Sequence, residues 1–208
     1  MKIAYPLSLA ILYNMSLLIS ASLPSPALAV EASELAASQC KSCHGPQGNS
    51  DKKEIPSIAG LSREYLLDSM NDFKSRKRLG EKYQPPGEKE TDMNEIMKSL
   101  SGQEMKSLAQ FFSQQVFIPR KQAYDEKLAK KGKKVYLKRC ERCHDDNGRA
   151  ADDDMGRLAG QSMEYLQEQL KNFISAKRKP PKKMAKQLKR LKPNDIPALI
   201  HFFAAQQT

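Results

Sequence analysis

Apolar side chains recur with helical spacing in several parts of the chain. Leu66, Met70 and Phe73 are spaced i, i+4 and i+7. The spacing i, i+3, i+4, i+7 occurs twice more, in Met105, Leu108, Ala109 and Phe112 and in Ile196, Leu199, Ile200 and Phe203. Side chains at this spacing share one face of an α-helix. Strong helix formers are common and Trp is absent, so the chain is expected to be all-α.

Capping residues indicate where the helices begin. Ser62 and Ser162 are expected N-caps. Ser101 and Glu104 have the spacing of a capping box, and Pro193 is expected in the first turn of the last helix. The expected helices are residues 31–40 and 124–140, two that follow Ser62 and Ser162 and run to about residues 75 and 176, and two more that begin at residues 101 and 193.

The helices belong to one sequence unit that is present twice. Ile58-Ala59-Gly60 matches Leu158-Ala159-Gly160 at an offset of 100 residues, and Phe111-Phe112 matches Phe202-Phe203 at an offset of 91. The first copy therefore has nine extra residues between Arg78 and Met93, and their glycines and prolines predict a surface loop.

This repeat predicts two domains of similar length. We place them at residues 30–118 and 119–208, with a linker at about residues 116–123. Pro119 lies in the linker and cannot continue a helix. Residues 1–29 are expected to form a cleaved signal peptide, because an apolar stretch follows Lys2 and ends in the A-x-A site Ala27-Leu28-Ala29. An uncleaved membrane anchor is the alternative, although prolines interrupt the apolar stretch.

The cysteines occur in two copies of one motif. Cys40, Cys43 and His44 form C-x-x-C-H, and Cys140, Cys143 and His144 form it again. This motif is the attachment site of c-type haem, in which the histidine is the proximal iron ligand. All four cysteines are used in this way. Two disulfides or a four-cysteine zinc site are the alternatives, but neither needs a histidine directly after both pairs.

The order of these features resembles the class I cytochrome c domain. Each copy has a helix, C-x-x-C-H, an Ala-Gly turn, a Tyr-Leu helix, a distal methionine and a closing aromatic helix. Two such domains in tandem, with Leu-Ala-Gly-Gln at 158–161, resemble the dihaem cytochrome c4 family. The resemblance implies an all-α fold, one covalently bound haem c in each domain, and His/Met ligation of both irons.

The repeat itself nominates the methionine ligands. Met93 and Met184 align at the offset of 91 residues, so both copies have a methionine there. Met97 aligns with a leucine and is expected in the core, although it is close enough to Met93 to be a rival. The expected iron ligands are therefore His44 and Met93 in the first domain and His144 and Met184 in the second. His201 projects on a different face from the apolar stripe and is not expected to bind iron.

Two further features follow from the resemblance. A proline carbonyl in this family accepts a hydrogen bond from the proximal imidazole; Pro56 fits this role, and Gly156 replaces it in the second copy. The family also packs its first and last helices through a glycine and an aromatic residue. Gly132 and Tyr136 match that pattern, whereas the first copy has alanines, so the first interface is expected to be looser.

Charge is distributed unevenly between the two domains. Residues 30–118 contain 12 Lys and Arg against 13 Asp and Glu, whereas residues 119–208 contain 22 against 11. The basic second domain is expected to dock on an acidic redox partner or an anionic membrane surface. Nucleic acid is not an expected partner of an exported haem protein.

These observations predict a function in electron transport. We expect a periplasmic dihaem carrier that passes single electrons from respiratory-chain donors to a terminal oxidase or reductase, with no catalysis of its own. One alternative is the haem subunit of a flavocytochrome c sulfide dehydrogenase. Another is a dihaem peroxidase, which would need an open iron position and which two distal methionines disfavour.

Overall fold

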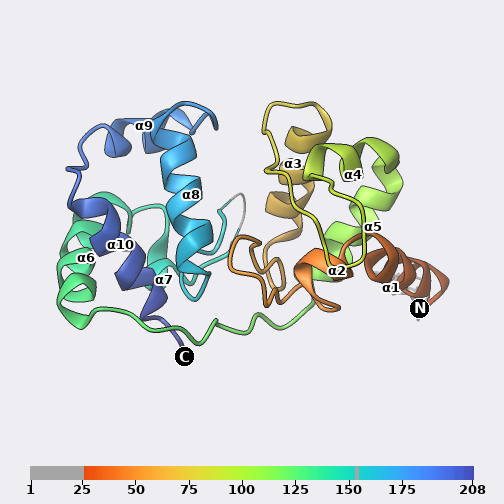
Figure 1. Ribbon diagram of the computed structural model, residues 1–208, viewed down its shortest axis with the longest axis horizontal. Helices are drawn as coiled ribbons and strands as arrows, with labels where there is room; N and C mark the ends of the chain where they lie inside the picture. The colour runs from red at the N-terminus through yellow and green to blue at the C-terminus, as the bar shows by residue number, and fades with distance from the viewer. Residues whose placement is uncertain (1–25, 153–154) are drawn as a thin grey trace, which may run out of the picture.

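The chain folds into two helical lobes that are joined by an extended linker (Figure 1). The computed structural model describes residues 26–152 and 155–208. The first lobe contains α1 (Pro26–Gln39), α2 (Lys41–His44), α3 (Arg63–Lys74), α4 (Met93–Ser99) and α5 (Gly102–Ser113). The second contains α6 (Glu126–Arg139), α7 (Asp145–Gly148), α8 (Met163–Ile174), α9 (Lys182–Leu188) and α10 (Asp195–Ala204). The expected all-α class is confirmed.

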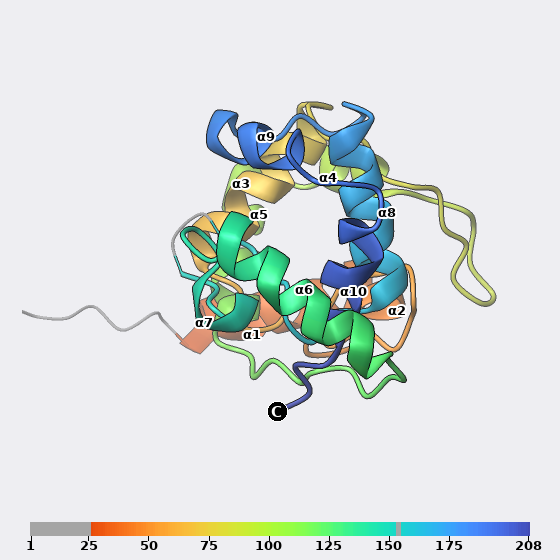
Figure 2. The ribbon, with the colours of Figure 1, turned by 90° about the vertical axis from the view of Figure 1, so that its left-hand side faces the viewer.

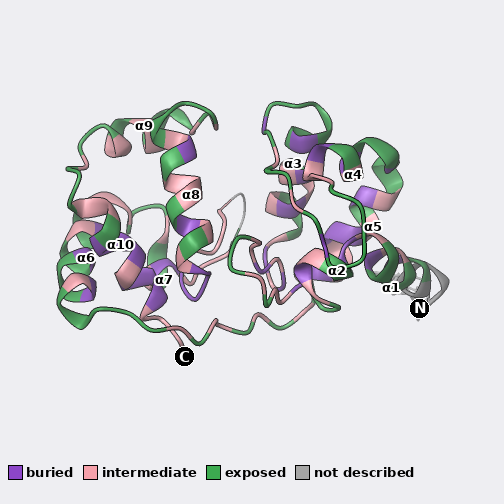
Figure 3. Cartoon of the chain, in the orientation of Figure 1, coloured by how far each residue is buried: buried purple, intermediate pink, exposed green. Residues whose placement is uncertain are grey.

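Each lobe has its own hydrophobic core. The stripe Leu66, Met70 and Phe73 on α3 is buried against the stripe of α5, and Leu199, Ile200 and Phe203 of α10 are buried in the second lobe. Buried residues occur in both lobes rather than only at the boundary between them (Figure 3). The apolar periodicity therefore identified the core of each lobe.

The first and last helices of the second lobe are in unusually close contact. A Cβ atom on Gly132 of α6 would lie 1.9 Å from the carbonyl oxygen of Ala198 on α10. The ring of Tyr136 packs on Phe202, with their centroids 4.9 Å apart. In the first lobe, α1 meets α5 through Ala32 and Ala36 and makes a less extensive contact. The expected difference between the two interfaces is confirmed for the described residues.

Three serines were expected to cap the N-termini of helices. Ser101 and Glu104 form the complete capping box, and Ser62 accepts a hydrogen bond from Tyr65 N–H. Ser162 occupies the N-cap position of α8, as expected, but it makes no capping hydrogen bond, because its hydroxyl donates to the Lys53 carbonyl of the other lobe.

The expected position of Pro193 was wrong. Helix α10 begins two residues later, at Asp195, with Asn194 as its N-cap. The carboxylate of Asp195 accepts a hydrogen bond from Lys192 N–H, so a turn comes before the helix. Short helices that the periodicity did not predict, α4 and α9, carry Met93 and Met184.

The nine extra residues of the first copy lie in a loop that leads into α4. Tyr83 and Thr91 exchange two backbone hydrogen bonds of 2.9 Å and close the loop as an isolated β-bridge. Figure 2 shows this loop reaching away from the body of the molecule.

The expected signal peptide lies almost entirely outside the described residues. Only its last four positions, at the start of α1, fall inside them. Within the described part of the chain, no helix combines the length and the apolar character that crossing a bilayer requires.

Candidate functional site

The first C-x-x-C-H motif forms a tight turn at the end of α1. Cys40 precedes α2, and its carbonyl accepts hydrogen bonds from the N–H groups of Cys43 and His44 at 3.3 and 2.8 Å. Both thiols are free. Burial, with a smaller effect from Cys43, raises the pKa of Cys40 to about 12. The buried thiol is therefore neutral and is not poised for disulfide exchange.

His44 is presented as a neutral ligand. Its side chain is buried, and Nδ1 lies 2.9 Å from the carbonyl oxygen of Pro56. Burial lowers the pKa of His44, the Pro56 carbonyl partly opposes this, and Arg78 lowers it further. Because a carbonyl can only accept, Nδ1 carries the proton and Nε2 keeps a free lone pair. The predicted hydrogen bond to Pro56 is confirmed.

The second motif has the same turn but different support for its histidine. His144 N–H donates to the Cys140 carbonyl at 2.9 Å, and the Tyr136 hydroxyl donates to the His144 carbonyl at 2.6 Å. Burial raises the pKa of Cys140 to about 11 and lowers that of His144. Among the described residues, the buried Nδ1 of His144 has no hydrogen-bond partner, although the Gly156 carbonyl is near enough to favour the protonated ring.

Met93 is the first residue of a firmly anchored helix. The Asp92 carboxylate accepts from Glu95 N–H at 2.9 Å and pairs with Lys82 at 3.0 Å. Asn94, directly after Met93, is buried and hydrogen-bonded through its amide. Met93 is half-buried and packs against the core cluster that includes Cys40.

Met184 lies on a less constrained helix. It is half-buried on α9, whose N-cap position is Pro181 and has no capping side chain. No residue of α9 is fully buried. The assignment of Met93 and Met184 as iron ligands stays a prediction.

The rival side chains have other roles in the structure. Met97 is 1% exposed and fills the first core. His201 accepts a hydrogen bond at Nδ1 from Asp125 N–H at 2.9 Å, so it fixes the start of α6. The repeat had predicted the core position of Met97, whereas no sequence pattern indicated the hydrogen bond between His201 and Asp125.

A polar network across the boundary between the lobes was missed by sequence reasoning. Arg78 and Arg178, which are repeat partners, both donate to Oε1 of Gln169, at 3.0 and 2.8 Å. Lys177 of the second lobe pairs with Glu81 of the first at 2.6 Å. The alignment of Arg78 with Arg178 in the repeat was the one sequence feature that pointed to the shared contact with Gln169.

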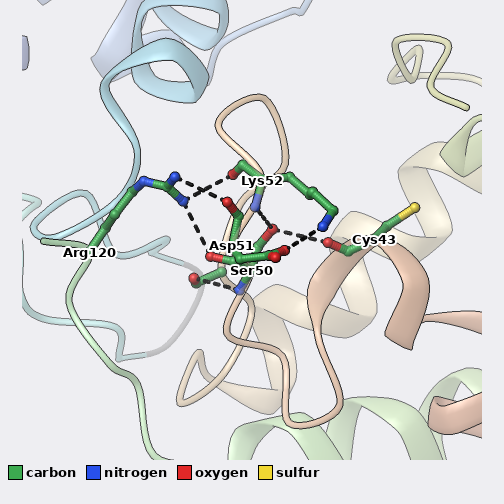
Figure 4. Close-up of polar contacts among 6 residues, drawn as sticks. Cys43, Ser50, Asp51, Lys52 and Arg120 are labelled. Atoms are coloured by element: carbon green, nitrogen blue, oxygen red, sulfur yellow. Dashed lines mark hydrogen bonds and ion pairs between the residues drawn. The ribbon is translucent and has the colours of Figure 1, made fainter. Parts of the chain in front are cut away.

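The linker also holds the first lobe. Arg120 donates to the backbone carbonyls of Ser50, Asp51 and Lys52 at 3.4, 3.1 and 3.3 Å (Figure 4). Ser50 in turn donates from its hydroxyl to the carbonyl of Cys43 at 3.0 Å. The loop that follows the first motif is therefore tied both to the motif and to the linker.

The donor set of each lobe fits a covalently attached haem. Each offers two free thiols followed directly by a histidine whose pKa is lowered by burial, which favours the neutral ring. Cys40 and Cys140 pack in different hydrophobic clusters, so a single zinc site formed from all four cysteines does not match this arrangement. The fold and both motifs define the protein as a c-type cytochrome.

Comparisons with known proteins identify the family. The family "Cytochrome c" matches residues 29–115, and "Cytochrome C oxidase, cbb3-type, subunit III" matches residues 127–203. Cytochrome c4 of Azotobacter vinelandii is 32% identical over 146 residues, which are 66% of this chain and 68% of that protein. The chain belongs to the cytochrome c4 family and is a cytochrome c4-like dihaem electron carrier.

Two more proteins extend this comparison. The crystal structure of reduced recombinant cytochrome c4 from Pseudomonas stutzeri matches with a TM-score of 0.70 and 29% identity, covering 86% of this chain and 98% of that one. The cytochrome subunit of sulfide dehydrogenase of Chlorobaculum tepidum is 34% identical over 79 residues, which are 38% of this chain and 62% of that protein. The resemblance to the cytochrome c4 family and the expected fold are thus confirmed.

Proposed function

We propose that the protein carries single electrons in the periplasm on two covalently bound haem c groups. Cys40 and Cys43 hold the first haem, with His44 and Met93 as its axial ligands. Cys140 and Cys143 hold the second haem, with His144 and Met184 as its axial ligands. The observation that carries the proposal is the buried, neutral His44, which keeps Nε2 free beside two free thiols. The donors are respiratory-chain proteins, and the acceptor is a terminal oxidase or reductase.

The haem supplies the one-electron couple, and the protein supplies its environment. Thioether bonds prevent loss of the group outside the cytoplasm. Pro56 holds the proton of His44 on Nδ1 and so orients the ring. Met93 and Met184 would each occupy the remaining binding position of an iron, which would suit electron transfer rather than bond chemistry.

Haem content and redox behaviour test this proposal. Intact-mass measurement of the mature protein should give two haem groups per chain. Replacing Cys40 and Cys43 by serine should remove one haem, and replacing Cys140 and Cys143 should remove the other. A protein that carries no haem, or that turns over peroxide through a high-spin iron, would contradict the carrier function.

The partner surface follows from the charge around α9. Seven Lys and Arg residues lie between residues 179 and 192, with no Asp or Glu among them. All seven are exposed, and none forms an ion pair with a residue in the described part of the chain. They are Lys179, Lys182, Lys183, Lys186, Lys189, Arg190 and Lys192. We call this set the α9 cationic surface.

The corresponding segment of the first lobe has the opposite charge. Residues 88–101, at the offset of 91, contain two Lys and four Asp or Glu. Because α9 carries Met184, the α9 cationic surface lies on and beside the helix that holds the proposed methionine ligand of the second haem. We propose that this surface docks an acidic redox protein, since complementary charge at the electron-exchange site accelerates encounter.

Charge reversal on α9 tests the docking proposal. The triple variant K182E/K183E/K186E should slow the oxidation of the second haem by hexacyanoferrate(III) about tenfold or more at low ionic strength. The matched control K130E/K131E/K134E changes the same net charge on α6. It should have a much smaller effect, and oxidation by cobalt tris(phenanthroline) should not be slowed by either variant.

Equal slowing by both triple variants would mean that only net charge matters and would overturn the assignment to α9. Membrane binding is a separate outcome. If α9 charge reversal abolished sedimentation with phosphatidylglycerol vesicles and left the hexacyanoferrate(III) rate unchanged, the surface would be a membrane contact instead.

A second candidate function rests on one comparison. The relative from Chlorobaculum tepidum is named as the cytochrome subunit of a sulfide dehydrogenase. This chain could by analogy be the haem subunit of such a complex. Co-purification of a flavoprotein in stoichiometric amount from the native source would favour this function over that of a free carrier.

A further inference from the structure

The side chain of Gln161 crosses the boundary between the lobes and clamps one residue of the first lobe. Its Oε1 accepts from Ser57 N–H at 3.0 Å, and its Nε2 donates to the Ser57 carbonyl at 2.7 Å. Gln161 is 3% exposed and Ser57 is 8% exposed. Buried amide groups are costly to leave unpaired, so this pair of bonds fixes the backbone of Ser57.

Ser57 is directly connected to the first haem site. The residue before it, Pro56, supplies the carbonyl that accepts from Nδ1 of His44. The Ser57 hydroxyl accepts from Ser50 N–H at 3.1 Å, and Ser50 donates to the Cys43 carbonyl. The clamp therefore acts on both the histidine and the cysteine of the first motif.

The second site has no such clamp. The repeat partner of Gln161 is Leu61, a buried apolar residue that cannot form these hydrogen bonds. Gly156 stands in place of Pro56, and its carbonyl lies near Nδ1 of His144 without meeting hydrogen-bond geometry among the described residues. The two haem sites thus differ in how the proximal histidine is held, although their motifs are the same.

We propose that Gln161 is a positioning residue for the first haem site, which it controls from the opposite lobe. By fixing Ser57 it holds the Pro56 carbonyl against His44. A proximal imidazole that donates from Nδ1 is a stronger electron donor to iron and stabilises the oxidised state. Gln161 therefore lowers the reduction potential of the first haem. This inference rests on the proposed function, because it requires His44 to bind the iron.

Two variants at position 161 test the inference in the intact holoprotein. Q161L introduces the residue that the repeat has at position 61, and Q161M keeps the length of the side chain without its hydrogen bonds. In a spectroelectrochemical titration, both should raise the potential of the first haem and leave that of the second unchanged. The Nδ1 proton of His44 should also exchange faster with solvent in NMR spectra.

Q122L is the matched control. Gln122 also uses both amide atoms, accepting from Met163 N–H at 3.1 Å and donating to the Gln161 carbonyl at 2.8 Å. Both bonds go to backbone groups of the second lobe and leave the Gln161 side chain bonded to Ser57, so Q122L should shift neither potential. The two haems are assigned through the methionine methyl resonances, with a Met93→Ala sample as reference.

Two results would overturn the inference. One is a folded Q161M protein with both potentials unchanged. The other is an equal shift of both potentials, which would indicate a general effect on the contact between the lobes. If the wild type lacked His/Met-ligated haem altogether, the proposed function would fail instead, and the two failures are therefore distinguishable.

Discussion

Asn94 donates a hydrogen bond from Nδ2 to the carbonyl oxygen of Phe73 at 2.6 Å. The same nitrogen donates to the Arg78 carbonyl at 2.9 Å, and Oδ1 accepts from Gly80 N–H at 2.9 Å. Asn94 thereby ties α4 to the end of α3 and to the start of the long loop. Because Met93 is the neighbouring residue, this contact fixes the helix that carries the proposed first methionine ligand.

Replacing Asn94 should loosen that methionine. Asn94→Ala leaves buried backbone groups without partners, which costs about 1–3 kcal/mol. The methionine–iron charge-transfer band of the first haem should weaken or be lost on mild heating, while that of the second haem is retained. The second lobe has Ala185 at the same repeat position, on α9. An Ala185→Gly variant therefore serves as a control for a general weakening of the helix that carries the methionine. Full retention of both bands in Asn94→Ala would contradict this role.

Acid should weaken the cap of α4. Partial burial would raise the pKa of Asp92, but hydrogen bonding from Glu95 N–H and the ammonium of Lys82 outweigh it, and the pKa is lowered. The ionised carboxylate thus stabilises the folded state at neutral pH. This contribution is complete above the unfolded carboxyl pKa of about 4 and is lost as the pH falls through the lower folded value.

The variant Asp92→Asn removes the negative charge of the side chain but keeps its capping hydrogen bond. Asparagine keeps an N-cap acceptor but does not titrate in this range. The midpoint of urea unfolding of the first lobe should therefore depend less on pH between neutral and strongly acid solution than in the wild type. An unchanged pH profile in the variant would show that Asp92 does not contribute to acid sensitivity.

The contact at Gly132 should tolerate no side chain. A Cβ atom there would meet the Ala198 carbonyl oxygen at 1.9 Å, so Gly132→Ala must separate α6 from α10. Overpacking of this kind costs about 1–3 kcal/mol or more, and the melting temperature of the second lobe should fall. Gly102→Ala is the control, since a Cβ at that position meets nothing within 4 Å. Equal melting temperatures for the two variants would contradict the close approach of the helices.

The sequence predicted the features that depend on local pattern. The C-x-x-C-H motifs, the buried stripes on α3, α5 and α10 and the capping box at Ser101 all follow from spacing. The repeat also identified the candidate methionine ligands. Aligning the two copies does not depend on helix propensity, so it could single out Met93 and Met184 on helices that the periodicity did not predict. The glycine and aromatic pattern of α6 was also sufficient to predict a tighter helix pair in the second lobe.

The sequence could not predict features that depend on how the lobes meet. The Gln161 side chain bonds to a residue 104 positions away, and no local pattern indicates that pairing. Ser162 has the residue type of an N-cap, yet its hydroxyl contacts Lys53 of the first lobe instead. Tertiary contacts thus redirected side chains whose local preference was clear.

Optical and magnetic spectra of the two methionine variants test the central claim most directly. The mature wild-type protein should contain two low-spin haems, each with a methionine–iron charge-transfer band. Met93→Ala should abolish one band and Met184→Ala the other, while Met97→Leu should retain both. If neither alanine variant lost a band, or if either variant lost both, the assignment of one axial methionine to each lobe would be wrong.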